Sequence, residues 1–194
     1  LQGGSTVDLR TIPAVVGGDE AKRHGVVLAK STPAKKFGIQ TGESLFAARV
    51  KCPGLTVVPP DFDFYVKNSK ALIQILNDYT PDVEQYSIDE AFLDLRGIET
   101  GRLEELGRHI SRTVRRNTGI PVSIGIAPTK TLAKIASKLC KEYPKLQGAC
   151  LMYRPQDIEK VLRKFPIEDV WGIGRKHRRM LQAANVRTAW DFVQ

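Results

Sequence analysis

The order of helical and strand patterns between residues 61 and 142 is the feature that most constrains the fold. The predicted elements are a helix from Asp61 ending before Pro81, strands over 83–87 and 91–95, a helix over 103–114, a strand over 122–127 and a helix over 129–139. Only three residues separate the first two strands, which predicts a tight hairpin. This order is that of a ferredoxin-like split βαβ unit without its first strand.

The segments on either side of this unit differ from it in character. Residues 1–60 carry short β-branched runs at 14–16, 26–28 and 56–58 and short helical patterns at 34–37 and 44–50, which predict a small α/β layer. Residues 143–194 carry a helical pattern at 157–163, a glycine turn at 170–175 and a very basic helical pattern at 176–184. We therefore expect an α+β chain of three parts, over residues 1–60, 61–142 and 143–194.

The charge of the chain favours a polyanionic partner. Its 194 residues include 30 Lys and Arg against 21 Asp and Glu, a net charge of +9. The cysteines (Cys52, Cys140, Cys150) and histidines (His24, His109, His177) show no spacing typical of a disulfide framework or a zinc site. No apolar run approaches the length of a membrane span, so a cytoplasmic location is expected.

Asp89 and Glu90 stand side by side in the predicted hairpin turn. Flanking strands would fix their backbone, and carboxylate oxygens are the ligands that Mg²⁺ prefers beside a substrate phosphate. Acidic residues also favour turns for purely local reasons. The pattern therefore leaves two readings open, a metal site or an ordinary polar turn.

Basic residues offer two further candidate sites. Lys130 lies at a predicted helix N-terminus, where backbone N–H groups and the helix dipole already favour phosphate, whereas Lys134 one turn later is equally compatible with a solvent-facing position. Two glycines precede a basic helix, which suits contact with DNA phosphates, although a plain helix end is a rival interpretation. The DNA-contact candidates are Gly172, Gly174, Arg175, Lys176, Arg178 and Arg179. Lys30 and Lys51 are interpreted as solvated, and Trp171 and Trp190 as core aromatics of a C-terminal helical module.

Four stretches of the sequence resemble the Y-family translesion DNA polymerases of the UmuC type (the ImpB/MucB/SamB family). Residues 86–95 (YSIDEAFLDL) resemble the palm motif of that family, and residues 122–134 (VSIGIAPTKTLAK) are similar to its second signature. Residues 26–39 (VVLAKSTPAKKFGI) look like its fingers motif, and residues 170–176 (VWGIGRK) resemble the helix-hairpin-helix turn of its thumb.

The resemblance implies a ferredoxin-like palm, small α/β fingers and a helical thumb with a helix-hairpin-helix. It implies that Asp89 and Glu90 hold two Mg²⁺ ions, and that Lys35, Lys130 and Thr32 contact the triphosphate. Thr32 stands where the family often has Tyr. The implied partners are primer-template DNA, deoxynucleoside triphosphates and a sliding clamp, and the implied role is low-fidelity lesion bypass in the SOS response, near the nucleoid.

The chain departs from the family pattern at both ends. The family begins with a strand bearing an Asp metal ligand, and nothing before Pro13 fits it, because the neighbours of Asp8 match the segment that enters the fingers. The sequence also stops at Gln194, before the little-finger domain. We therefore expect little activity from this chain alone.

Two alternatives to a polymerase follow from the same residues. The first is a non-catalytic DNA-binding or interaction protein that retains the palm fold. The second is another nucleotidyl transferase or cyclase on a ferredoxin-like palm, which the thumb-like GIGRK turn disfavours.

Overall fold

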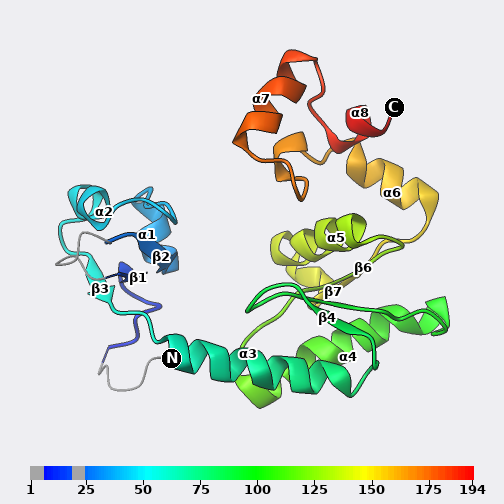
Figure 1. The fold of residues 1–194 in the computed structure, drawn as a ribbon, viewed down its shortest axis with the longest axis horizontal. Coiled ribbons are helices and arrows are strands. Elements are labelled where there is room, and N and C mark those ends of the chain that lie inside the picture. Colours follow the sequence, from blue (N-terminus) through cyan, green and yellow to red (C-terminus); the bar gives the residue numbers. More distant parts are fainter. Residues whose placement is uncertain (1–6, 19–24) are drawn as a thin grey trace. The chain divides into compact units, whose positions relative to one another are not determined.

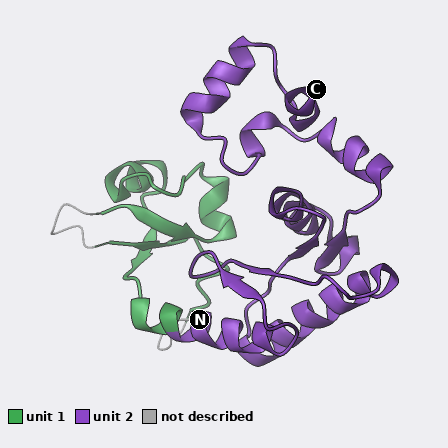
Figure 2. Ribbon diagram, turned by 45° about the vertical axis from the view of Figure 1, so that its right-hand side comes forward, with its two compact units in different colours: residues 1–66 green, residues 67–194 purple. Residues whose placement is uncertain are grey.

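The computed structural model describes residues 7–18 and 25–194 and divides into two compact units between Val66 and Lys67 (Figure 2). Helix α3 (Phe62–Asn77) crosses this division. His24 and the first six residues lie outside the described residues. The chain is mixed α and β, as the sequence predicts.

The first unit is built on a three-stranded sheet. Strand β1 (Ala14–Gly17) lies in the centre, antiparallel to β2 (Val27–Lys30) and parallel to β3 (Thr56–Val58). Two short helices, α1 (Thr32–Lys36) and α2 (Leu45–Lys51), lie between β2 and β3 in the sequence. All five elements predicted for this part of the chain are confirmed, with bounds shifted by at most two residues.

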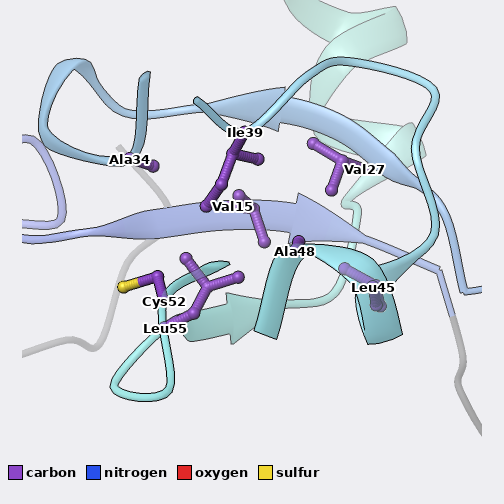
Figure 3. Close-up of a cluster of buried hydrophobic side chains, with 8 residues drawn as sticks. All are labelled: Val15, Val27, Ala34, Ile39, Leu45, Ala48, Cys52 and Leu55. Atoms are coloured by element: carbon purple, nitrogen blue, oxygen red, sulfur yellow. The ribbon is translucent and has the colours of Figure 1, made fainter. Parts of the chain in front are cut away.

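Apolar side chains from the sheet and both helices form the core of the first unit (Figure 3). Val15 from β1 and Val27 from β2 meet Leu45 and Ala48 from α2 and Ala34 from α1, and all five are fully buried. Because Ala34 is buried in the middle of α1, the opposite face of this short helix is turned to solvent. That face carries Lys35.

The second unit contains the predicted elements in the predicted order, together with further elements that the sequence did not predict (Figure 1). After α3 come β4 (Val83–Gln85), β5 (Ala91–Leu93), α4 (Thr100–Thr118), β6 (Ile124–Ile126), α5 (Lys130–Glu142), a 3-10 helix (Pro144–Leu146), β7 (Ala149–Leu151), α6 (Pro155–Leu162), a second 3-10 helix (Ile167–Asp169), α7 (Arg175–Ala183) and α8 (Ala189–Val193). The predicted N-caps are confirmed: an Asp61 carboxylate oxygen accepts from Phe64 N at 2.9 Å, and the Thr129 hydroxyl accepts from Leu132 N at 3.3 Å.

Strand pairing in the second unit differs from the sequence prediction in one respect. Strands β4 and β5 form the predicted antiparallel hairpin, but β6 pairs in parallel with β7, a strand that the sequence analysis missed. The run that forms β7 is only three residues long, too short to show a period of two. Within the described residues the hairpin and the β6–β7 pair are separate ladders.

A shared apolar cluster nevertheless joins the hairpin to β6. Val83 and Leu93 of the hairpin pack with Ile124 of β6 against Leu76 of α3 and Ile110 of α4. Within the described residues the two ladders share no backbone pairing. Packing on common helices is what holds them together in the described residues.

Helices α4 and α5 cover opposite faces of the β6–β7 pair (Figure 1). The approach of α5 is very close at Gly125, where a Cβ atom would lie 1.9 Å from the Ala133 carbonyl oxygen and 2.3 Å from Ser137 N. On the other face, a Cβ atom at Gly107 of α4 would lie 3.0 Å from Ala149 of β7. Glycine at position 125 therefore sets how near α5 lies to the strand.

A second apolar cluster joins α5 to the C-terminal helices. Ile135 and Ala136 of α5 pack with Met152, Phe165 and Ala189, which follow β7 in the sequence. The three cysteines are free and buried, and Cys140 and Cys150 lie in this cluster. Among the described residues no helix has the length and apolar character needed to cross a membrane.

Substituting Gly125→Ala is expected to destabilise the second unit by about 3 kcal/mol, because the added methyl group meets the backbone of α5 rather than a movable side chain. Urea unfolding followed by tryptophan fluorescence measures this, since both tryptophans lie in the second unit. Gly101→Ala is the control, because its Cβ would meet only a Glu99 side-chain oxygen at 3.9 Å. Equal effects of the two substitutions would contradict the close-approach argument.

Candidate metal centre and phosphate-binding surfaces

The hairpin turn carries Asp89 and Glu90, which we call the carboxylate pair. The strands are shorter than predicted, so residues 86–90 form the turn. The backbone N–H groups of Tyr86 and Ser87 both donate to the Glu90 carbonyl oxygen at 3.0 Å, and the Ser87 hydroxyl donates to Asp89 Oδ1 at 2.8 Å. These bonds fix the backbone of the turn while both carboxylates remain exposed.

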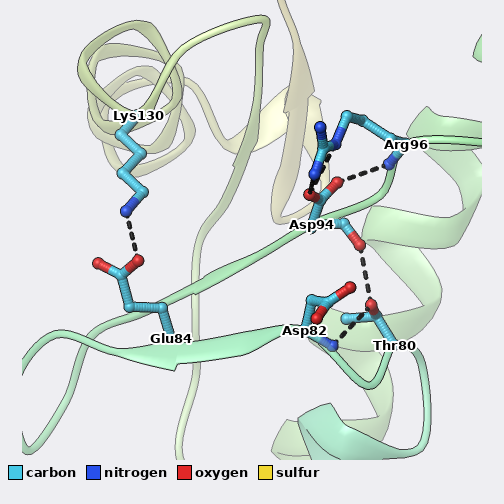
Figure 4. A network of polar contacts seen from close by, with 6 residues as sticks. All are labelled: Thr80, Asp82, Glu84, Asp94, Arg96 and Lys130. Carbon is cyan, nitrogen blue, oxygen red and sulfur yellow. Dashed lines mark hydrogen bonds and ion pairs between the residues drawn. The ribbon is translucent and has the colours of Figure 1, made fainter.

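A polar network fixes the other end of the hairpin (Figure 4). The buried Thr80 hydroxyl donates to the Asp94 carbonyl oxygen at 2.9 Å and accepts from Asp82 N at 3.2 Å. Asp94 N in turn donates to the Asp82 carbonyl oxygen at 3.0 Å. Arg96 donates a hydrogen bond to the Asp94 carboxylate and lowers the pKa of Asp94. Asp94 is therefore part of the polar network at the base of the hairpin.

One face of α5 carries three lysines at four-residue spacing, Lys130, Lys134 and Lys138, which we call the lysine row. Each lysine pairs with an acid from a different element: Lys130 with Glu84 of β4 (Figure 4), Lys134 with Glu90, and Lys138 with Asp169. Each ammonium also lies over an aromatic ring, at 5.1 or 5.2 Å from its centroid. The row is therefore anchored along its length.

Lys134 contacts the carboxylate pair, although the sequence analysis favoured Lys130 as the functional lysine and found Lys134 equally compatible with a solvent-facing position. Its Nζ lies 2.9 Å from both carboxylate oxygens of Glu90. Lys130 sits in the first turn of α5, as predicted, with its ammonium on Glu84. The structure thus places Lys134, and not Lys130, directly on the carboxylate pair.

Trp171 was predicted to be a core residue of the C-terminal helices, and this prediction is wrong. Its ring packs instead on the hairpin, with centroids 5.2 Å from Tyr86 and 5.7 Å from Phe92. The indole N–H lies 3.3 Å from the Tyr86 hydroxyl oxygen, to which it donates. Trp190 does pack in the C-terminal cluster, as predicted. A pairing between residues 85 positions apart leaves no periodic signal in the sequence.

The carboxylate pair suits Mg²⁺ in its donor chemistry. Mg²⁺ in proteins is bound by one or two carboxylates together with water and substrate phosphates, and the oxygens of Asp89 and Glu90 are exposed on a fixed turn. Across residues 7–18 and 25–194, however, no three acidic, His or Cys side chains gather as a metal site. Asp8 lies in the first unit, where the Arg10 side chain holds its pKa at about 2.

Thr32 and Lys35 lie in the first unit on α1, and both are exposed. The N-cap residue Ser31 fixes this helix, because its hydroxyl donates to the Ile12 carbonyl oxygen at 2.8 Å and accepts from Ala14 N at 3.0 Å and Ala34 N at 3.1 Å. Two of these contacts tie the start of α1 to β1 and the segment before it, and the third caps the helix.

Lys30 and Lys51, interpreted as solvated, prove to be structural. Lys30 Nζ donates to the Ile39 carbonyl oxygen at 2.7 Å, and Lys51 Nζ donates to the Gly38 carbonyl oxygen at 3.1 Å. Lys51 also pairs with Glu43 and lowers the pKa of that carboxyl group. Both lysines hold the loop after α1, and a side chain donating to a distant backbone carbonyl cannot be read from local sequence.

The basic helix α7 begins directly after the glycine turn. Gly172 has a φ of 90°, a left-handed conformation that favours glycine, and Gly174 is the N-cap of α7. A hollow is lined by Arg175, Arg178, Arg179 and Gln182, which share one helix face, and we call it the arginine hollow. Arg178 pairs with Glu168 at 3.3 Å, whereas Lys176 does not line the hollow.

Comparison of the sequence with known proteins identifies one family. Residues 4–138 match the sequence profile of the impB/mucB/samB family. The chain belongs to this family. It is 42% identical over its whole length to DNA polymerase IV of Clostridium acetobutylicum, of which it covers 48%, and 37% identical over 87% of its length to protein UmuC of Salmonella typhimurium, of which it covers 41%.

Solved structures of DNA polymerases are similar to this chain in fold. DinB from Sulfolobus solfataricus gives a TM-score of 0.80 at 28% identity, with 93% of this chain and 52% of that chain covered. The insertion ternary complex of Dbh DNA polymerase gives 0.78 at 28% identity, with 91% and 51% covered. The chain thus spans about half the length of these impB/mucB/samB relatives, and the predicted resemblance is confirmed.

Replacing Thr80 by Val is expected to destabilise the second unit by about 1–2 kcal/mol, because it leaves the Asp94 carbonyl and the Asp82 N–H without their partner. Urea unfolding followed by tryptophan fluorescence is the measurement. The control is Thr100→Val at an exposed position of α4, where a change below about 0.5 kcal/mol is expected. A Thr80→Val effect as small as the control would show that the network does not stabilise the hairpin.

Proposed function

We propose that this chain supplies the metal-binding turn and the phosphate-binding surfaces of a Y-family DNA polymerase that carries out template-directed, low-fidelity lesion bypass. The observation that carries the proposal is the carboxylate pair, held on a fixed turn beside the lysine row in a member of the impB/mucB/samB family. The named DNA polymerases among the relatives support it.

We further propose that the three predicted parts of the chain have the functions of the corresponding parts of such polymerases. Residues 1–60 would act as fingers, residues 61–142 as the palm and residues 143–194 as a partial thumb. The similarity to DinB and Dbh over more than nine-tenths of the chain supports this division. In the palm, the first strand of the split βαβ unit would fall between the hairpin and β6.

Asp89 and Glu90 would hold Mg²⁺. When bound, the metal ions of such sites activate the primer 3′-hydroxyl and stabilise the departing pyrophosphate. The Ser87 hydroxyl orients the Asp89 carboxylate for this role, and the backbone bonds to the Glu90 carbonyl keep the turn from collapsing. Because no third acid joins the pair in the described part of the chain, we expect this chain alone to extend primers poorly.

Lys35, Thr32 and Lys130 would bind the triphosphate of the incoming nucleotide. Thr32 and Lys35 are exposed on a helix whose first turn is fixed by Ser31, so the cost of ordering them is low. Lys130 would exchange Glu84 for a phosphate oxygen, a partner of higher charge.

The arginine hollow and the glycine turn before it would bind the DNA backbone. Arg175 and Arg179 present guanidinium groups on one face of α7, and Gly172 and Gly174 leave the turn open to a phosphate. Lys176 and Arg178 would add charge at the edge of this surface. Contacts of this kind fix the position of a protein on DNA and read no base sequence.

Primer extension with Mg²⁺ and all four deoxynucleotides tests the catalytic proposal. It compares this chain with a version extended at its N-terminus by a strand bearing an aspartate, as the family pattern expects. The extended version should be active, and Asp89→Ala or Glu90→Ala should lower its rate by about 10²–10³ or more, because each removes a ligand that stabilises charge in the transition state. Activity that survives both substitutions would refute the metal site.

A non-catalytic DNA-binding protein remains the second candidate, since only two acids gather at the turn among the described residues. If the extended version binds primer-template DNA but never extends it, this second candidate replaces the first.

DNA binding by the arginine hollow is tested by fluorescence anisotropy with a labelled primer-template across a range of salt concentrations. Replacing Arg175 and Arg179 by Ala should weaken binding to all sequences alike and reduce the slope of log K against log salt by about 0.9 for each phosphate that is no longer neutralised. Arg116→Ala, an exposed position on α4, is the control. An unchanged slope would exclude the hollow as a phosphate site.

A further inference from the structure

The contact between Lys134 and Glu90 is not used by the proposed function. Glu90 comes from the hairpin turn and Lys134 from the second turn of α5, and the lysine ammonium lies 2.9 Å from both carboxylate oxygens. The side chain of Lys134 is 25% exposed and that of Glu90 is 46% exposed. Half of the carboxylate pair is thus already neutralised by the protein itself.

Two aromatic rings hold the ammonium at this place. Lys134 Nζ lies 5.2 Å from the ring centroids of both Tyr86 and Trp171, within the range of a cation–π contact. The two rings meet edge to face at 87° and are joined by the indole N–H bond to the Tyr86 hydroxyl. The lysine therefore has an anion on one side and two π faces around it, an environment that restrains a normally mobile side chain.

The other lysines of the row show that this arrangement is specific to position 134. Lys130 lies over one ring, Phe92, and Lys138 over one ring, Phe165, and neither pairs with Asp89 or Glu90. Only Lys134 among these three both lies over two rings and pairs with an acid of the carboxylate pair. Trp171 is the connection, because it comes from the turn before α7 and reaches across to the hairpin.

We propose that Lys134 is a resident counter-cation of the carboxylate pair, held on Glu90 by Tyr86 and Trp171, and that a divalent metal must displace its ammonium from Glu90 to bind. The proposal rests on the assignment of Asp89 and Glu90 as metal ligands. Both cations draw on the same two oxygens, and a divalent ion is repelled by an ammonium at that range. Trp171 is in this view a positioning residue, which acts on the metal site through Lys134.

Binding of Mn²⁺ to the purified chain, followed by loss of the electron paramagnetic resonance signal of free Mn²⁺, tests the proposal without any assay of activity. Lys134→Met keeps the aliphatic stem but removes the charge, and it should tighten Mn²⁺ binding by about two- to fivefold. Lys134→Arg keeps the charge and should bind Mn²⁺ as the parent chain does. Trp171→Leu keeps the lysine but loosens its hold, so it should tighten binding by a smaller factor.

Lys138→Met is the matched control, because Lys138 lies one turn further on the same helix face and its substitution also removes an acid partner and a ring interaction. If Lys134→Met tightens binding no more than Lys138→Met does, the counter-cation proposal is overturned and the effect is one of net charge. Circular dichroism of each variant confirms that the fold is retained.

Asp89→Asn and Glu90→Gln distinguish failure of this inference from failure of the proposed metal site. If both weaken Mn²⁺ binding but Lys134→Met behaves as the control, the metal site stands and the counter-cation falls. If neither weakens Mn²⁺ binding, the metal site itself is refuted. A double-mutant cycle between Lys134→Met and Glu90→Gln, read by urea unfolding in EDTA, tests the ion pair itself. The cycle should show a coupling energy between the two side chains that added Mg²⁺ reduces, and absence of coupling overturns the ion pair.

Discussion

The close approach of α5 to β6 at Gly125 is the constraint on which the arrangement of the second unit depends. With no side chain at this position, the backbone of α5 lies almost against the strand, and a Cβ atom there would overlap the Ala133 carbonyl oxygen. The position of α5 in turn sets where Lys130, Lys134 and Lys138 stand. A helix held one methyl group further away would carry its lysines away from the hairpin, and the carboxylate pair would lose its neighbouring cation.

The hairpin of β4 and β5 is the second element that places the carboxylate pair. Hydrogen bonds at its base and its tip stabilise it, since its strands are short. Its strands are only three residues each, too short to be stable alone. At its base, Thr80 joins Asp82 to Asp94, and at its tip the Glu90 carbonyl accepts two backbone bonds. These bonds fix the backbone that carries Asp89 and Glu90.

Basic side chains in the second unit fall into two groups, those paired with acids and those that line an open surface. The three lysines of the lysine row are each matched by an acid and a ring, whereas Arg175 and Arg179 on α7 line an open hollow. The net charge of +9 therefore comes from basic side chains in two kinds of surroundings, some paired with acids and others lining an open surface. Of the paired lysines, Lys134 lies on the carboxylate pair, whereas the guanidinium groups of Arg175 and Arg179 line the hollow.

The sequence by itself determined the order of elements from α3 to α5, the N-caps Asp61 and Thr129, the hairpin and its acidic turn, because each depends on neighbours within a few residues. It also determined family membership through local motifs. Only the tertiary structure decided the β6–β7 pairing, the structural roles of Lys30 and Lys51, and the place of Trp171 on the hairpin with Lys134 on Glu90. These contacts join distant segments, and their energy depends on packing geometry that leaves no local pattern in the chain.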